Sequence, residues 1–267
     1  MTDHLSLRRR HLTPLLAAAG LLLLFALVVA IMDTNAALFL MLNQDASLLP
    51  NALWANLTFT ADTVFAMSLL LLLASVRPSL FAPALVLLLL GTLFVHGSKA
   101  LFDAARPAAV LIPDSFHIIG PVLRHHSFPS GHAFTALGTW TLVILALSPR
   151  WLMPLLIFAL LAAASRIAVG AHWPLDVLVG AACGILGACL SAWLALKFDW
   201  LHHPAATFTS ASLLTLAALY MPFFDSRYPD TQILANLVAL VALLTAICRF
   251  WWPALSKRHQ KANSSSV

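Results

Sequence analysis

Glutamate is absent from this sequence, and only 9% of its 267 residues carry a charged side chain. A typical soluble domain has about 25% charged residues, so the composition excludes an ordinary soluble domain. Without glutamate there can be no H-E-x-x-H zinc motif. The three cysteines lie inside apolar runs without C-x-x-C spacing, which predicts buried packing rather than disulfides or metal ligands. Because 61% of the residues are hydrophobic, the sequence indicates an integral membrane protein.

The longest apolar runs have the length of membrane-spanning helices. The first covers about 12–32 and follows three arginines, and it is longer than the apolar region of a typical signal peptide. We therefore expect an uncleaved helix and a cytoplasmic N-terminus. Residues 33–56 are more polar and predict a loop or interfacial helices on the outer side. Seven further runs predict spans at about 57–76, 80–98, 133–148, 151–169, 174–196, 207–224 and 233–250. The expected fold is an all-α polytopic membrane helical bundle.

Basic residues are distributed unevenly between the two sides of this predicted bundle. With a cytoplasmic N-terminus, the inner segments contain most of the Lys and Arg, in agreement with the positive-inside rule. The outer segments contain only Lys99, Arg106, Arg124, Arg166 and Arg227. Four of these flank the third to sixth predicted helices, so we expect an anionic ligand there. The net charge of +5 is explained by this topology and does not indicate a nucleic-acid partner.

The first outer cluster is the stretch KALFDAARP, which contains Lys99 and Arg106. Their separation of seven residues is close to two helical turns, which predicts that both point the same way until Pro107 ends the helix. Two cations on one face suit a phosphate, and an arginine can bind two of its oxygens at once. Asp103 lies between them and could pair with Arg106. The alternative is a pair of interfacial anchors.

The second outer cluster is Pro129, Ser130, Gly131 and His132, immediately before an apolar run. Ser130 is a good candidate for the N-cap of the helix, and Gly131 lets a ligand approach the backbone closely. The start of a helix also attracts anions. The pattern indicates an anion site that includes a histidine, although ordinary capping beside an interfacial histidine would look the same.

The third outer cluster is the stretch SRIAVGAHWPLD, residues 165–176. Gly170 and Pro174 predict that one helix ends and another begins there, which places His172 near a helix N-terminus. His172 and Asp176 are four residues apart and can touch, while Arg166 adds a cation. Taken alone, these could be interfacial residues. Because all three clusters are predicted at the same outer face, one composite site is the better interpretation.

These residues resemble a known family signature. Lys99-x6-Arg106-Pro107, then Pro129-Ser130-Gly131-His132, then Ser165-Arg166-x5-His172-x3-Asp176 match the three motifs of the type 2 phosphatidic acid phosphatases. The resemblance implies a six-helix catalytic core over residues 1–200. Two additional transmembrane helices would follow at 201–253, outside the resemblance. A polar cytoplasmic tail would occupy 254–267.

The resemblance also implies a role for each residue of the motifs. His172 would be the nucleophile that forms a phosphohistidine, and Asp176 would orient it. His132 would be the general acid that protonates the leaving group. The phosphate would be bound by Lys99, Arg106, Ser130, Gly131 and Arg166. We expect no metal or other cofactor: His125 and His126 could suggest a metal site with His132 and His172, but the nearby arginines would repel a divalent cation.

The function expected from this resemblance is hydrolysis of a lipid phosphate or diphosphate by a multi-pass protein of a bacterial inner membrane, at its outer face. The substrate classes left open are undecaprenyl diphosphate, phosphatidylglycerol phosphate, phosphatidic acid and lipid A. One alternative is a phosphotransferase that passes the phosphate to another lipid. Another is a binding or transport protein without turnover, which the two histidines and Asp176 disfavour because binding needs only the cations. The sequence does not indicate an oligomeric state.

Overall fold

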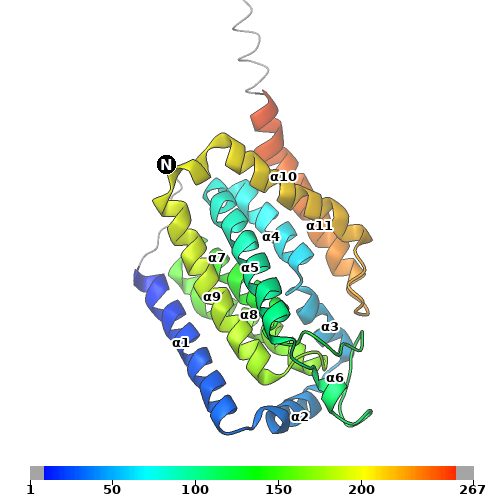
Figure 1. The fold of residues 1–267 in the computed structure, drawn as a ribbon. Coiled ribbons are helices and arrows are strands. Elements are labelled where there is room, and N and C mark those ends of the chain that lie inside the picture. Colours follow the sequence, from blue (N-terminus) through cyan, green and yellow to red (C-terminus); the bar gives the residue numbers. More distant parts are fainter. Residues whose placement is uncertain (1–8, 257–267) are drawn as a thin grey trace, which may run out of the picture.

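The structure is a computed structural model that describes residues 9–256. Within this range all regular structure is helical, which confirms the predicted fold class (Figure 1). The α-helices are α1 (Arg9–Ile31), α2 (Asn35–Ala46), α3 (Asn51–Phe59), α4 (Thr63–Val76), α5 (Phe81–Phe102), α6 (Pro107–Val110), α7 (Gly131–Ala146), α8 (Leu152–Ala168), α9 (Pro174–Lys197), α10 (Pro204–Tyr220) and α11 (Gln232–Ala246). Arg8 and residues 257–267 of the predicted polar tail lie outside the described residues, whereas residues 254–256, also predicted to belong to the tail, are helical.

Six helical segments of the described chain are long and apolar enough to cross a membrane. They are His11–Ile31, Pro78–Val110, Pro149–Ala168, Pro174–Lys197, Pro204–Phe223 and Gln232–Ser256, and each covers one of the predicted spans. The two remaining predicted spans correspond to the bent pair α3 and α4 and to the shorter helix α7. The chain is therefore a multi-pass membrane protein, as the composition predicted.

The predicted span at 57–76 differs from the structure because the helix is broken near its start. Helix α3 ends at Phe59, and α4 begins at Thr63 with a bend of 62° between them. Asp62 causes the new start: its carboxylate accepts a hydrogen bond of 2.8 Å from the backbone N–H of Val64, which makes it the N-cap of α4. The predicted interfacial segment at 33–56 does form helices, namely α2 and most of α3.

Small residues bring α7 and α9 together in the centre of the bundle. A side chain at Gly184 would place its Cβ 2.4 Å from the carbonyl oxygen of Phe134, and one at Gly180 would lie 2.4 Å from that of Ser130. The two backbones are thus in direct contact, a packing mode typical of membrane helices. As a result, the N–H of Ser130 donates to the carbonyl oxygen of Asp176 over 3.0 Å. The second and third sequence motifs are joined at this point.

Asn43 of α2 links three separate segments at the end of the bundle that contains the motifs. Its side-chain nitrogen lies 2.9–3.1 Å from the carbonyl oxygens of His117, Ile167 and Ala168, and its oxygen accepts from the N–H of His117 over 2.7 Å. Asn43 is fully buried, so these bonds satisfy polar groups that water cannot reach. They hold the loop after α6 against the end of α8.

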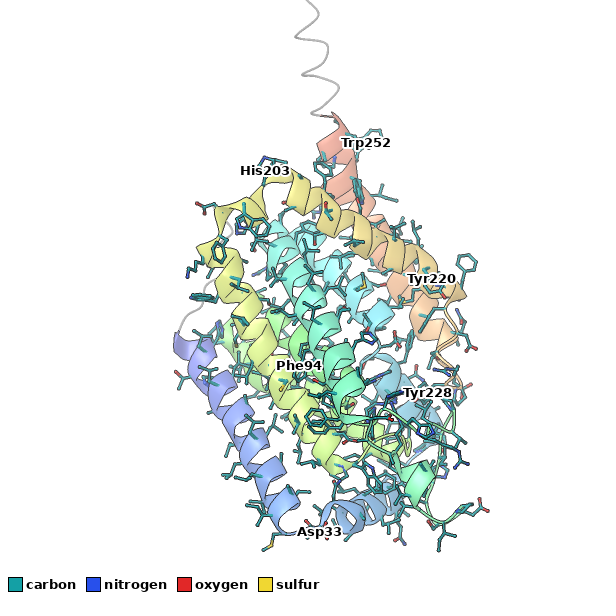
Figure 2. All side chains as sticks on the ribbon, in the orientation of Figure 1. Asp33, Phe94, His203, Tyr220, Tyr228 and Trp252 are labelled. Carbon is teal, nitrogen blue, oxygen red and sulfur yellow. The ribbon has the colours of Figure 1, made fainter. Side chains whose placement is uncertain are left out.

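The two C-terminal helices pack on the side of the bundle formed by α4 and α5 (Figure 1). Helix α10 contacts both α4 and α5, and the hydroxyl of Ser210 donates to the carbonyl oxygen of Phe81 over 2.7 Å. Helix α11 packs against α4. The loop between α10 and α11 includes Tyr228, which lies near the end that carries α3 and α6, whereas His203 and Trp252 lie at the opposite end (Figure 2).

Candidate active site

The loop between α8 and α9 turns back on itself so that Arg166 and His172 become neighbours. The backbone N–H groups of Ala171 and His172 both donate to the carbonyl oxygen of Arg166, over 3.0 and 3.2 Å. Gly170 has φ +75°, and a Cβ there would lie 2.8 Å from the carbonyl oxygen of His117. Both the left-handed backbone and the close approach require glycine. Pro174 then begins α9, so the predicted end and restart of the helix are confirmed.

Asp176 lies in the first turn of α9 and holds His172 in place. Its Oδ2 accepts from the Ser127 hydroxyl over 2.5 Å and from the Trp173 N–H over 3.0 Å, and it lies 3.3 Å from Nδ1 of His172. The His172 and Asp176 side chains are 2% and 4% exposed. Because the carboxylate is fixed by two other donors, the imidazole has one orientation available to it.

The contact between Arg106 and His172 assigns the tautomer of the histidine. Nη1 of Arg106 lies 3.1 Å from Nε2 of His172. A guanidinium can only donate hydrogen bonds, so Nε2 must be the acceptor and the ring proton must lie on Nδ1, facing Asp176. The lone pair of His172 is therefore on Nε2, on the side of the ring where Arg106 lies.

Arg106 is buried, and backbone carbonyl groups hold its guanidinium. Nε donates to the carbonyl oxygen of His125 over 2.7 Å, Nη2 to that of His126 over 3.2 Å, and Nη1 to that of Ala171 over 2.8 Å. In the described part of the chain, no carboxylate lies within salt-bridge distance of this arginine. Arg106 thus keeps its positive charge available at the histidine.

Arg166 is only 1% exposed and is likewise held by neutral groups. Nη1 donates to the Thr58 hydroxyl and to the Tyr228 hydroxyl, each over 2.7 Å. Its Nε is buried without a hydrogen-bond partner, and among residues 9–256 no carboxylate forms a salt bridge with it. An isolated buried charge is costly, so two arginines without counterions mark a site built for an anion.

The surroundings of His172 keep its ring neutral. Burial, and after it the positive charges of Arg106, Arg166 and Lys99, hold the pKa of His172 well below its ordinary value. Lys99 contributes from the last turn of α5. A neutral imidazole with its lone pair on Nε2 is the form that can act as a nucleophile.

The second motif forms the start of α7, as predicted. Ser130 is the N-cap, and its hydroxyl accepts from the N–H of Ala133 over 3.3 Å. Gly131 lies in the first turn, where a Cβ would come within 3.0 Å of Val95. His132 follows, 30% exposed, with Nε2 3.7 Å from Oδ2 of Asp62. This helix N-terminus adds partial positive charge to the site.

Comparison with known proteins places these motifs in a family. Residues 80–200, which include all three motifs, match the family model of the PAP2 superfamily. Through this segment, the chain is similar to the PAP2 superfamily. The match leaves out α1 to α4 and the two C-terminal helices.

Two relatives are named as phosphatases. The chain is 37% identical over 95 residues to an undecaprenyl-diphosphatase of Sulfolobus acidocaldarius, which is 35% of this chain and 43% of that protein. It is 36% identical over 88 residues to a lipid A 1-phosphatase of Rhizobium johnstonii, or 30% of this chain and 36% of that protein. The chain thus spans less than half the length of these two relatives.

A solved structure extends the similarity to the fold. The crystal structure of Aquifex aeolicus LpxE superimposes with a TM-score of 0.53 at 27% sequence identity. The alignment covers 61% of this chain and 95% of that one. The helical PAP2 architecture is therefore shared, and part of this chain lies beyond the aligned region.

The structure corrects how the first motif reaches the site. Helix α5 ends at Phe102, because Asp103 adopts a left-handed conformation with φ +35°. Lys99 and Arg106 therefore do not project from one helix face: Lys99 is helical and Arg106 comes from the loop. The expected pairing of Asp103 with Arg106 is also wrong, since Asp103 lies 3.1 Å from Nδ1 of His126. Both predicted cations still act on His172.

Sequence reasoning missed the partners that lie outside the PAP2 motifs. Thr58 and Asp62 interrupt an apolar run, a signal that was visible but not specific. Ser127 precedes the second motif by two residues and had no recognised role. Tyr228 lies in the loop between the two C-terminal helices, where no motif or spacing points to it. Each touches a PAP2 residue through a contact between distant parts of the chain.

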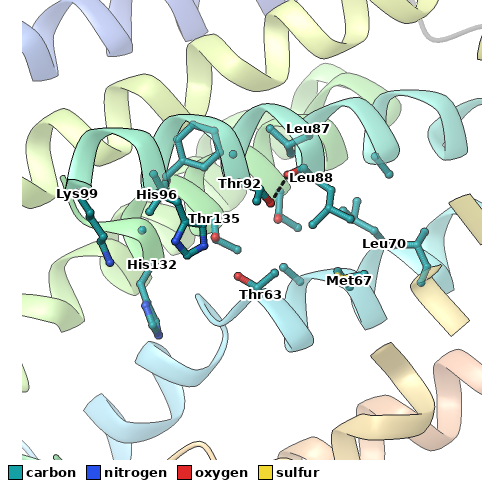
Figure 3. Close-up of a pocket in the computed structure, with 18 residues that line it drawn as sticks. Thr63, Met67, Leu70, Leu87, Leu88, Thr92, His96, Lys99, His132 and Thr135 are labelled. Atoms are coloured by element: carbon teal, nitrogen blue, oxygen red, sulfur yellow. Dashed lines mark hydrogen bonds between the residues drawn. The ribbon is translucent and has the colours of Figure 1, made fainter. Parts of the chain in front are cut away.

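An apolar cavity of about 280 Å³ leads away from the site between α4, α5 and α7. Lys99, His96 and His132 lie at one end, and Leu70 lies toward the other (Figure 3). A second, more open hollow shares His96 and Lys99 with this cavity. It is lined by His96, Lys99, Ala100, Arg106, His125 and His126. The candidate site thus adjoins one apolar and one polar space.

Proposed function

We propose that this PAP2 protein is a lipid phosphatase that hydrolyses a lipid phosphate or diphosphate through a phosphohistidine on His172. The observation that carries the proposal is the pair of buried arginines without carboxylate partners in the described chain, one of which lies 3.1 Å from Nε2 of a histidine held neutral. A phosphoryl group would supply the missing negative charge. It would also give the Nε2 lone pair an electrophile.

In the first step, Nε2 of His172 attacks the terminal phosphorus and the N–P bond forms. The P–O bond to the leaving group breaks, which releases a lipid alcohol from a monophosphate or a lipid phosphate from a diphosphate. Arg106 would move its Nη1 donor from Nε2 to a phosphate oxygen as the substrate enters. Charge on the phosphoryl oxygens is stabilised by the cations and the α7 N-terminus. His132, protonated once the anionic phosphate offsets the nearby cations, gives its proton to the leaving oxygen, and Asp176 stabilises the positive ring through Nδ1–H.

In the second step, water attacks the phosphorus of phosphohistidine. Neutral His132 takes a proton from that water, the N–P bond breaks, and inorganic phosphate and free His172 are regenerated. The hollow lined by His125 and His126 supports hydrolysis over transfer to another lipid, because it gives water a polar route to Arg106. The mechanism requires no metal.

The cavity beside Lys99 supports a substrate with an apolar chain. It is lined mostly by apolar residues of the spanning helices, so a lipid tail could enter from the bilayer while the phosphate meets the cations. A cavity of this volume suits a single chain better than the several chains of lipid A. Because a relative is named undecaprenyl-diphosphatase, we propose a polyprenyl diphosphate first, at the periplasmic or outer face of an inner membrane.

A phosphate-release assay on the purified protein tests this function. Undecaprenyl diphosphate, phosphatidylglycerol phosphate, phosphatidic acid and lipid A would each be supplied in detergent micelles, with EDTA, and with or without an acceptor lipid. We expect free phosphate without acceptor, fastest from undecaprenyl diphosphate. Phosphorylated acceptor lipid without free phosphate would show a phosphotransferase instead, and no product from any substrate would reject both enzymes.

The lowered pKa of His172 predicts the acid side of the pH profile. The nucleophile must be unprotonated. The ordinary pKa of histidine is 6.5, so kcat/KM limited by His172 should not yet decrease at pH 6.5 and should fall only at lower pH. Lys99→Met removes a positive charge, which raises the pKa of His172, so the fall should begin at higher pH than in wild type. Both proteins would be assayed with the same substrate, so that titration of the substrate's phosphate affects the two pH profiles equally. An unchanged or downward shift would contradict the proposed electrostatics.

A further inference from the structure

The loop between α10 and α11 reaches the candidate active site from outside the PAP2 segment. The hydroxyl of Tyr228 accepts a hydrogen bond of 2.7 Å from Nη1 of Arg166, and the guanidinium carbon lies 5.6 Å from the centre of the Tyr228 ring. The two residues are 62 positions apart in the sequence. One side chain thus contacts the buried arginine through both its hydroxyl and its aromatic ring.

The loop is organised in a way that fixes this tyrosine. The hydroxyl of Ser226 accepts from the N–H of Tyr228 over 3.1 Å and lies 2.8 Å from the hydroxyl of Thr231. Gly120 lies against the ring: it has φ +80°, and a Cβ at this position would lie 2.7 Å from Cδ1 of Tyr228. Any larger residue at Gly120 would collide with the ring. The position of Tyr228 is therefore determined at both its backbone and its ring.

The contacts of Arg166 leave a particular edge of its guanidinium for a ligand. Nη1 carries two hydrogens, and the hydroxyls of Thr58 and Tyr228 accept both. The remaining donors are Nε and Nη2, which lie along one edge and can bind two phosphate oxygens at once. Nε is buried and has no partner among the described residues, and no hydrogen bond of Nη2 occurs within that part of the chain.

We propose that Tyr228 positions Arg166 so that its Nε and Nη2 edge binds the phosphate of the substrate. This inference rests on the proposed function in assigning phosphate to Arg166. It makes the loop of the C-terminal helical pair a fourth part of the active site, beside the three PAP2 motifs. The two additional helices are then required for phosphate binding, because they carry and fix the loop.

Tyr228→Phe tests the proposal, because it keeps the ring and removes only the hydroxyl. The chain has just one other tyrosine, Tyr220, which is exposed at the end of α10 and packs against Phe224. Tyr220→Phe is therefore a matched control. The dissociation constant of inorganic phosphate would be measured calorimetrically on each purified protein. We expect binding about tenfold weaker for Tyr228→Phe and unchanged for Tyr220→Phe, with kcat/KM reduced in proportion.

A double-mutant cycle separates positioning from general structural damage. In an Arg166→Lys background, the ammonium group has no Nε and Nη2 edge to orient, so adding Tyr228→Phe should not weaken phosphate binding further. Structural damage by Tyr228→Phe would persist in that background and would overturn the proposal. Equal phosphate affinity of wild type and Tyr228→Phe would overturn it as well.

The proposed function can fail separately from this inference. If wild type hydrolyses a lipid phosphate but Tyr228→Phe binds phosphate normally, the function stands and the positioning role is wrong. If no lipid phosphate is hydrolysed yet the cycle gives the expected phosphate affinities, the positioning role stands and the phosphatase function is wrong. Wild type that binds no inorganic phosphate would count against Arg166 as a phosphate ligand and would overturn the inference.

Discussion

His172→Gln should reduce phosphate release by about 10³-fold or more, the largest effect of any single substitution in this chain. Glutamine fills a similar volume and can still hydrogen-bond to Arg106 and Asp176. It has no ring nitrogen with a lone pair, so no phosphohistidine can form. The measurement is the initial rate of phosphate release from undecaprenyl diphosphate, together with trapping of a labelled phosphoenzyme, which we expect in wild type alone.

His202→Gln provides the matched control for this substitution. His202 belongs to the short helix that follows α9, and its Nε2 lies 2.8 Å from the carbonyl oxygen of Ala195. The next residue, His203, lies at the end of the bundle opposite Tyr228 (Figure 2). A glutamine amide can replace that bond, so activity should equal that of wild type. Robust turnover by the His172→Gln protein, or a labelled intermediate that survives in it, would show that another residue is the nucleophile.

The sequence was sufficient for those features that depend on local spacing. Apolar runs predicted the spans because a helix in a bilayer must satisfy its own backbone and present apolar side chains to lipid. Gly170 and Pro174 predicted the break between α8 and α9, since each favours a backbone that a continuous helix cannot adopt. The same local reasoning predicted Ser130 as the N-cap of α7.

Local spacing was insufficient where a residue's role depends on the packing of distant segments. The separation of Lys99 and Arg106 predicted a shared helix face, but Asp103 ends the helix between them. The hydroxyls that hold Arg166 come from α3 and from the loop after α10, at sequence separations of 108 and 62. No periodicity links such positions, and Tyr228 lies outside the PAP2 segment altogether. The motifs could predict which residues meet the substrate, but not which residues hold them.

Asp176→Asn is the substitution for which we expect the second largest effect. Oδ2 of Asp176 now lies near three donors, the Ser127 hydroxyl, the Trp173 N–H and the His172 Nδ1–H. An amide NH₂ at that position would face the fixed N–H of Trp173, so the amide oxygen should occupy it instead. His172 would then keep its proton on Nδ1 and its lone pair on Nε2. The substitution therefore removes charge without reversing the tautomer.

Loss of the negative charge of Asp176 should lower mainly kcat. As His172 attacks phosphorus its ring becomes positive, and three nearby cations already disfavour that charge. Asp176 is the carboxylate in contact with the ring, so its neutral replacement destabilises the transition state more than the bound substrate. We expect kcat to fall by about 10² to 10³-fold, less than the 10⁴-fold known where such a change also reverses the tautomer. KM should change little.

Asp199→Asn, which alters an exposed carboxylate in the short helix after α9, serves as the control and should leave kcat unchanged. A loss in the Asp176→Asn protein equal to that of His172→Gln would mean that the tautomer had reversed and Nε2 no longer carried the lone pair. A change confined to KM would place Asp176 in ground-state binding and contradict its assigned role. An intermediate loss in kcat fits only a carboxylate that stabilises the ring while the histidine remains a competent nucleophile.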